Sequence, residues 1–374
     1  MKTQHSRRVR AAIGLGIASA VVLGGCAGGG APATDDGFAP DDEELVFVDG
    51  VLQPLSDGFP SSQLRFIVVD EAGSNDGIYA RNLAEAAKPF SPVDIAVEDR
   101  PEFGSTYGAW EAIDWASQQR GGDEGYYSVV VTIPGATIDL IATPVGVDLG
   151  VGIEDMNTTL LTESVPYVFV TRKDAPWGTD FAAMLEYSKT NEVKYISRGP
   201  GSGPDLSMQY YANIAGATFN TSVGGSHDEI LTAIGAGVGD IAVTLPGAAS
   251  PFVQDGTVEF MTCSGSENPC AANWGTDVPN AATFLGIDGD TWGTNRGMAP
   301  PAGIPESHHR WLEALMLAAV DTDSFIEARS SIPGTGLVKI RREESFEVAR
   351  TAYTLAFDLL EELGQVSPGV ERLD

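Results

Sequence analysis

Two glycine-rich loops hold the residues best suited to binding a small ligand. The first, Ala72–Gly77, follows a strand expected over Leu64–Val69 and opens a helix that ends before Pro89. Backbone N–H groups in such a loop, and in the first turn of its helix, donate to an anion without help from a basic side chain. This pattern predicts a site for a small polar or anionic ligand. The alternative is an ordinary connecting loop.

The second loop, Arg198–Asp205, has the same form and opens a helix expected over Leu206–Ala215. Asn75 or Asp76 is the expected N-cap of the first helix, and Ser202 or Asp205 that of the second. The candidate ligand-binding residues lie in these loops and after other expected strands. They are Gly73, Ser74, Asn75, Asp76, Gly135, Ala136, Gly201, Ser202 and Asp205, with Gly224, Gly225 and Thr244 as second choices.

Alternating strand and helix patterns predict the elements that position these loops. Apolar strands are expected over 64–69, 93–98 and 126–133, each followed by a loop and a helix, and the same order recurs over 165–263. Such repeats form parallel sheets with right-handed crossovers. Two sheets whose glycine loops face each other would form a ligand-binding cleft.

The N-terminus has the pattern of a bacterial lipoprotein leader. Basic residues precede an apolar run, and small residues lead to Leu23–Cys26, which is typical of a lipobox. We therefore expect residues 1–25 to be a signal peptide, Cys26 to be lipidated, and residues 26–60 to be a flexible tether. The protein would be exported and anchored on the outer face of the cytoplasmic membrane. Arg7 and Arg8 leave twin-arginine export open as the route.

Charge and cysteine content narrow the remaining possibilities. A formal net charge of −30 argues against a nucleic-acid partner, because a phosphate backbone requires a basic patch. Cys263 and Cys270 are expected to form a disulfide in an oxidising compartment. A metal site there is the weaker alternative, since no histidine lies near either cysteine. We expect neither a metal nor a cofactor.

Seven segments, in order along the chain, resemble those of the extracytoplasmic solute receptors of the tripartite tricarboxylate transporter family, also called Bug receptors. They are Ala72–Gly77 with Ala80 and Arg81, Asp99–Ser105, Glu124–Tyr127, Gly201–Leu206, Ala236–Asp240, Val278–Asn280 and Trp292–Pro305. The resemblance implies an α/β fold of the type II periplasmic-binding-protein (Venus-flytrap) class. It also implies a two-lobed organisation, with lobe 1 over 61–160 and 282–374 and lobe 2 over 161–281.

The resemblance further implies a monomeric receptor, not an enzyme. It would hold a small carboxylate by backbone N–H groups of the two loops and pass it to membrane subunits of the transporter. Asp70, Glu71 and Asp205 depart from the family pattern. Either these carboxylates point away from the cleft, which is the favoured interpretation, or the ligand is neutral, amine-bearing or metal-bridged.

Two other functions stay open at this stage. A sensory receptor that signals to a membrane partner would have the same sequence features. A secreted hydrolase is the weaker alternative and would use His227, but the consecutive side chains of Ser226–Asp228 cannot converge as a catalytic triad. His308 and His309, in a predicted helix, are expected at the surface or at an interface.

Overall fold

The computed structural model describes residues 38–105, 108–265, 279–287 and 292–373. All of the described residues belong to one compact unit, which begins at Phe38. The expected signal peptide, the lipidation site Cys26 and the second cysteine of the expected disulfide, Cys270, lie outside the described residues. Among the residues that are described, none of the helices has both the length and the apolar character required to cross a bilayer.

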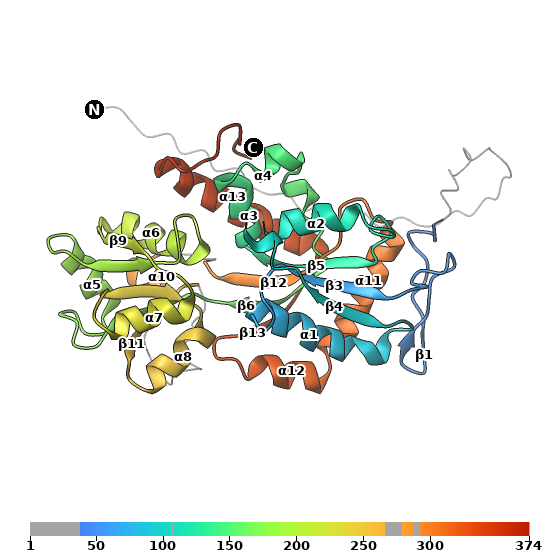
Figure 1. Cartoon of the computed structure of the whole chain (residues 1–374), viewed down its shortest axis with the longest axis horizontal. Helices are drawn as coiled ribbons and strands as arrows, with labels where there is room; N and C mark the ends of the chain where they lie inside the picture. The colour runs from blue at the N-terminus through green and yellow to red at the C-terminus, as the bar shows by residue number, and fades with distance from the viewer. Residues whose placement is uncertain (1–37, 106–107, 266–278, 288–291, 374) are drawn as a thin grey trace, which may run out of the picture. The chain divides into compact units, whose positions relative to one another are not determined.

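The larger of two main sheets has six strands in the order β13-β6-β12-β5-β3-β4 (Figure 1). Its strands are β3 (Leu64–Val68), β4 (Ile95–Asp99), β5 (Tyr127–Ile133), β6 (Leu160–Val165), β12 (Thr294–Ala299) and β13 (Gly336–Arg341). Strands β3, β4 and β5 are parallel, while β12 is antiparallel to both β5 and β6. The apolar runs of β3 and β5 are buried, as expected for strands that helices cover on both faces.

Helices cover both faces of this sheet, and together they form lobe 1. Helix α1 packs against α11 and α12 on one face, whereas α2, α3 and α13 pack against β5 on the other. The helices are α1 (Asn75–Ala87), α2 (Ala109–Ser117), α3 (Gly135–Ala142), α4 (Val145–Leu149), α11 (Glu306–Val320), α12 (Asp323–Ser330) and α13 (Arg342–Glu362), with short 3-10 turns η1 (Lys88–Phe90), η2 (Phe103–Ser105) and η3 (Ile153–Asp155).

The second main sheet has five strands in the order β11-β7-β10-β8-β9 and, with its helices, forms lobe 2. Its strands are β7 (Val168–Arg172), β8 (Lys194–Ser197), β9 (Asn220–Val223), β10 (Ile241–Thr244) and β11 (Val258–Cys263). Its helices are α5 (Phe181–Ser188), α6 (Gly203–Ala215), α7 (His227–Gly235), α8 (Pro246–Gln254) and α10 (Ala281–Leu285). Strands β8, β9 and β10 are parallel.

The chain crosses from lobe 1 to lobe 2 through only two residues, Pro166 and Tyr167, which separate β6 from β7. The crossing expected at residue 160 therefore comes after Val165, because β6 pairs within the six-stranded sheet. The return comes later than residue 282, since α10 packs on α5 and α6 of lobe 2. Because β6 ends where β7 begins, the carboxyl ends of the parallel strands in both sheets meet at this crossing.

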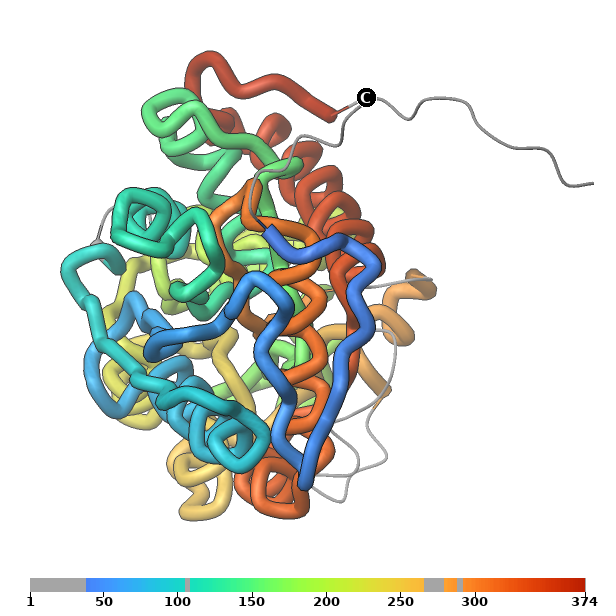
Figure 2. Tube along the Cα trace, turned by 90° about the vertical axis from the view of Figure 1, so that its right-hand side faces the viewer, coloured from blue at the N-terminus to red at the C-terminus, as the bar shows by residue number. Residues whose placement is uncertain are grey.

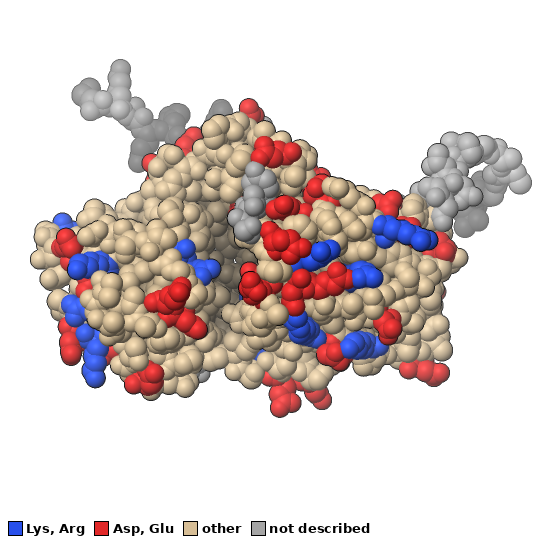
Figure 3. All heavy atoms as spheres, viewed as in Figure 1, with Lys and Arg blue, Asp and Glu red and all other residues tan. Residues whose placement is uncertain are grey.

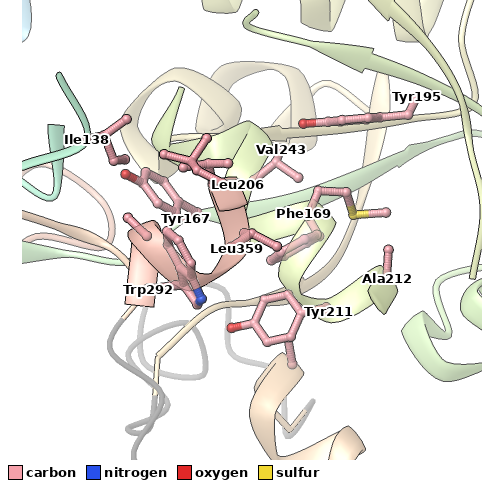
Figure 4. Packing of buried hydrophobic residues seen from close by; sticks show 14 of the residues in the cluster. Ile138, Tyr167, Phe169, Tyr195, Leu206, Tyr211, Ala212, Val243, Trp292 and Leu359 are labelled. Carbon is pink, nitrogen blue, oxygen red and sulfur yellow. The ribbon is translucent and has the colours of Figure 1, made fainter. Parts of the chain in front are cut away.

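One hydrophobic cluster continues from lobe 1 into lobe 2. Figure 4 shows Ile138 of α3 and Leu359 of α13 beside Tyr167 and Leu206, and all four are buried. Aromatic side chains of lobe 2, such as Phe169, extend the same cluster beneath α5 and α6. Helices α3 and α13 of lobe 1 therefore belong to the same hydrophobic cluster as α6 of lobe 2.

The segment Phe38–Pro60, which we call the N-terminal strap, packs along α11 and contains a short hairpin, β1 (Phe47–Val48) with β2 (Val51–Leu52) (Figure 2). His308 of α11 stacks on Phe59 and lies 2.7 Å from the carboxylate of Asp57, measured from Nε2 to Oδ2. The strap is therefore folded, and only the part of the expected tether before residue 38 lies outside the described residues. The expectation that the histidine pair of α11 lies at the surface is wrong, because both side chains are buried.

Candidate functional site

The loops after the parallel strands of both lobes surround a hollow that we call the cleft. The strand directions put the segments after β3 and β5 of lobe 1, and those after β8 and β9 of lobe 2, at the carboxyl ends that meet at the lobe crossing. Figure 3 shows this hollow, with acidic and basic side chains mixed on the visible face of lobe 1 and both kinds also present on lobe 2. Charges of both signs therefore lie near the cleft.

The first loop leads directly into α1. The Ser74 hydroxyl accepts from the Gly77 N–H at 3.0 Å, so Ser74 is the N-cap in place of the expected Asn75 or Asp76. Within the described part of the chain, the N–H groups of Asn75 and Asp76 have no acceptor. These two N–H groups, at the positive end of the helix dipole, can donate to an anion.

A buried ion-pair network holds this helix end against the sheet. Arg296 of β12, which is 4% exposed, donates from Nε to Asp76 Oδ1 at 2.7 Å and from a terminal nitrogen to Glu163 Oε2 at 2.6 Å. Glu163, on β6, is fully buried and also pairs with Arg329 of α12. The two carboxylates raise the pKa of Arg296 against the opposing effect of burial. Arg296 thus offsets part of the charge of Asp76.

Asp70, just after β3, is an acid of lobe 1 on which a charge of lobe 2 acts. Burial and the neighbouring Asp76 carboxylate raise its pKa, while the guanidinium groups of Arg198 and Arg296 act in the opposite direction. Arg198 belongs to lobe 2, directly after β8. For Asp70 and for the exposed Glu71, the expectation that the side chain points away from the cleft stays a prediction.

Arg198 was not among the candidate ligand-binding residues, although its position in the sequence could have indicated one. It stands at the carboxyl end of a parallel strand, where ligands of α/β proteins bind. Its side chain is exposed and donates to the carbonyl of Gly225 at 3.2 Å. No carboxylate pairs with it among the described residues. It is a cation available to a ligand.

The second loop is braced from within by Asp205. This carboxylate is 2% exposed and accepts from the Ser197 hydroxyl at 2.6 Å, from Gln209 at 2.6 Å and from the Gly201 N–H at 3.3 Å. Burial nevertheless raises the pKa of Asp205. These contacts indicate that Asp205 holds the loop together, and the expectation that it points away from a ligand stays a prediction.

Ser202 occupies the N-cap position of α6, but its hydroxyl makes no capping bond. The Oγ atom is buried and has no partner among the described residues. A Cβ atom at the next residue, Gly203, would lie 2.1 Å from the hydroxyl oxygen of Tyr167, so only glycine permits this close approach to the lobe crossing. The loop is therefore held next to the lobe crossing, and the Ser202 hydroxyl there has no hydrogen-bond partner among the described residues.

The second-choice residues surround His227, the first residue of α7. Its Nδ1 atom lies 2.7 Å from the buried Thr244 hydroxyl, and burial together with Arg198 lowers the pKa of His227 to about 4. Ser226 is the N-cap of α7 and accepts from the Glu229 N–H at 3.3 Å. Ser226 and His227 are thus engaged separately and do not form a catalytic pair.

Gly135 and Ala136 begin α3, directly after β5, and place a second helix N-terminus at the cleft. The indole of Trp110 donates to the Ala136 carbonyl at 2.7 Å and fixes this turn. One turn later, burial raises the pKa of Asp139 to about 7. The first turn of α3 therefore presents backbone N–H groups near Asp139, the acid whose pKa is raised.

The remaining site expectations concern cysteines and metals. Cys263, at the end of β11, is disulfide-bonded, and its expected partner Cys270 lies outside the described residues. No cluster of His, Cys, Asp and Glu able to hold a metal ion is present in the ranges that the structure describes.

Known proteins resemble this chain in structure more clearly than in sequence. No protein-family model matches the chain, and neither does any curated protein. A TctC solute binding protein from Polaromonas, solved without ligand, is 22% identical, covers 81% of this chain and 99% of its own, and has a TM-score of 0.65. MatC from Rhodopseudomonas palustris, with bound malate, is 20% identical over 81% of this chain and 100% of its own, with a TM-score of 0.59. A second protein from this species, with adipate, is 15% identical over 83% and 99%, with a TM-score of 0.63.

These likenesses confirm the fold that the sequence resemblance implied. The chain has the two-lobed α/β fold of periplasmic binding proteins, and the structures it resembles include receptors of the TctC type.

Proposed function

We propose that this chain is an exported solute-binding lipoprotein that captures a small carboxylate in the cleft and delivers it to the membrane subunits of a tripartite tricarboxylate-type transporter. The observation that carries the proposal is the exposed guanidinium of Arg198, which follows β8 and has no carboxylate partner among the described residues, together with the backbone N–H groups at the start of α1. Two structurally similar proteins were solved with the dicarboxylates malate and adipate, which supports this ligand class.

The arrangement favours a ligand with a carboxylate at each end. One carboxylate would pair with Arg198, since a guanidinium binds a carboxylate through two parallel hydrogen bonds. The other would accept from the free N–H groups of Asn75 and Asp76, where Arg296 already offsets part of the charge of the Asp76 side chain. A single ligand would then contact both lobes and hold them together.

Thermal shift of a soluble form that begins after Cys26 tests this proposal. Phe38–Asp374 is one compact unit by itself, so this form retains the described fold. We expect malate, adipate or a related dicarboxylate to raise the melting temperature by a few degrees at about 100 times its dissociation constant. Arg198→Gln should weaken binding about tenfold or more, since it removes a charge-assisted bond.

Lys189→Gln is the matched control, because Lys189 is a cation of lobe 2 at the end of α5, where it pairs with Glu186. It should bind dicarboxylates like the wild type. Equal affinity in the wild type and Arg198→Gln, or a shift with neutral solutes alone, would contradict the carboxylate assignment. Uptake assays with the neighbouring membrane genes deleted would then separate delivery to a transporter from signalling.

A further inference from the structure

His227 is a titratable side chain of lobe 2 to which the proposed function gives no role. It is the first residue of α7, which follows β9. Arg198 directly follows β8, and Thr244 is the last residue of β10. Because β8 is parallel to both β9 and β10, these three residues lie at the same edge of the lobe 2 sheet, where the carboxyl ends of the strands meet the lobe crossing.

Two hydrogen bonds hold the His227 ring and Arg198 close to each other. The ring Nδ1 atom lies 2.7 Å from the hydroxyl oxygen of Thr244. A terminal nitrogen of Arg198 donates at 3.2 Å to the carbonyl of Gly225, which belongs to the loop that leads to His227. Burial of the ring and the nearby Arg198 charge lower the pKa of His227 to about 4. The imidazole is therefore uncharged near neutral pH.

The Thr244 hydroxyl determines which ring nitrogen carries the proton. Thr244 is fully buried, and Nδ1 of His227 is the one hydrogen-bond partner of its hydroxyl within the described part of the chain. A hydroxyl that donates to Nδ1 satisfies both its own hydrogen and the lone pair of the uncharged ring. The opposite arrangement is unfavourable, because it would leave the hydroxyl hydrogen buried without an acceptor. The ring proton is therefore on Nε2, and this nitrogen is a donor.

The Nε2 atom of His227 is accessible to a ligand. It makes no hydrogen bond to the described residues, and its ring is only partly buried, in contrast to the enclosed Nε2 atom of His309. It belongs to a ring close to the exposed guanidinium of Arg198, for which the described residues supply no carboxylate partner. These two groups are donors and one of them is a cation, so together they suit an anion.

We propose that His227 is a second donor to the ligand carboxylate that pairs with Arg198, and thus a specificity-determining residue of the cleft. This inference rests on the proposed function. A carboxylate has two acceptor oxygens, so it can accept from a guanidinium and from an imidazole N–H at the same time. An ammonium group in this place would meet two donors and a positive charge while it has no acceptor of its own. Thr244 is a positioning residue, because its hydroxyl holds the ring in the tautomer that donates from Nε2.

Calorimetric titration of the soluble form that begins after Cys26 with malate and with adipate tests the inference. We expect His227→Leu to weaken binding about tenfold or more, and His227→Gln, whose amide N–H still donates, to retain part of the affinity. Thr244→Val should weaken binding about two- to fivefold, since the ring loses its fixed tautomer. Thr171→Val is the matched control and should leave the affinity unchanged, because Thr171 is also fully buried but lies at the opposite end of the same sheet, beside Ile241. Melting curves without ligand verify that the variants are folded.

Nitrogen NMR of the histidine rings adds a measurement that does not depend on any ligand. The His227 ring of the wild type should carry its proton on Nε2, and Thr244→Val should shift the ring toward a mixture of both tautomers. A proton on Nδ1 in the wild type, or an unchanged tautomer in Thr244→Val, overturns the inference. If the wild type binds malate or adipate and His227→Leu binds it equally well, the inference is overturned while the proposed function stands. If the wild type binds no dicarboxylate at about 10 mM, a concentration that detects even millimolar affinity, the two fail together.

Discussion

Arg296→Met offers the most direct test of how lobe 1 supports the cleft. The substitution preserves much of the side-chain volume but removes the charge that Asp76 and Glu163 share. Breaking a buried ion pair typically costs about 3–5 kcal/mol, because one charge is left unpaired. Glu163 keeps Arg329 and Asp76 reaches solvent at the loop, so we expect the lower figure, about 3 kcal/mol.

Urea denaturation and thermal unfolding of the soluble form measure this loss. About 3 kcal/mol corresponds to a melting temperature lower by about 6–12 °C, if the sensitivity of domains of 150–250 residues applies. Arg81→Met is the control: Arg81 also pairs with a carboxylate near α1, that of Asp99, but its side chain is 42% exposed, so we expect a loss of at most about 1 kcal/mol.

A double substitution separates loss of charge pairing from loss of packing. Asp76→Asn combined with Arg296→Met removes the carboxylate left unpaired, so we expect it to recover part of the lost stability. The single variant Arg296→Met should also weaken dicarboxylate binding, because Asp76 would then lack its ion-pair partner at the N-terminus of α1. If Arg296→Met costs no more than Arg81→Met, the network does not have the role we assign to it.

Two further predictions concern α3 and the lobe crossing. Burial raises the pKa of Asp139 to about 7, so the folded state retains a proton that the unfolded state releases near pH 4. The free energy of unfolding should therefore fall between about pH 4 and pH 7, by up to about 1.4 kcal/mol per pH unit relative to Asp139→Asn. Parallel pH profiles of the two proteins would refute this. Gly203→Ala should cost about 1–3 kcal/mol in urea denaturation, because the new methyl overlaps the Tyr167 hydroxyl, and Tyr167→Phe in the same chain should recover part of it; additive losses would contradict this contact.

The layout of the fold could be predicted because local patterns and tertiary packing agree along most of the chain. The helix predicted to contain His308 and His309 is confirmed as α11, whose apolar face belongs to the core of lobe 1. The strap was predicted as the end of the tether, although it carries the apolar run Leu45–Val48 together with Val51, Leu52, Leu55 and Phe59. The burial of Leu52 and Phe59 depends on α11, which lies some 250 residues further along the sequence.

The site was less predictable, because its main charges act over long sequence separations. Arg296 and Glu163 each stand in a short strand, TNRGMA and LLTESV, in which the residues on either side of the charge are polar or glycine, so the local pattern does not mark either charge as buried. Neither partner of Arg296 is near it in sequence, so the pairing follows only from the order of strands in the sheet. Asp205 shows the opposite case, since its partners Ser197, Gly201 and Gln209 are all local.

Three acids in or next to the two loops differ in their surroundings, and this difference bears on how an acidic protein can bind an anion. Glu71, the remaining acid that departs from the family pattern, is exposed. Arg296 offsets part of the charge of Asp76, and Asp205 is enclosed by its own loop. Asp70 is the acid on which the Arg198 charge acts, so a carboxylate that pairs with Arg198 would compete with it. Asp70→Asn should therefore tighten dicarboxylate binding if Asp70 only opposes the ligand, whereas weaker binding would mean that Asp70 accepts a hydrogen bond from a ligand hydroxyl or amine.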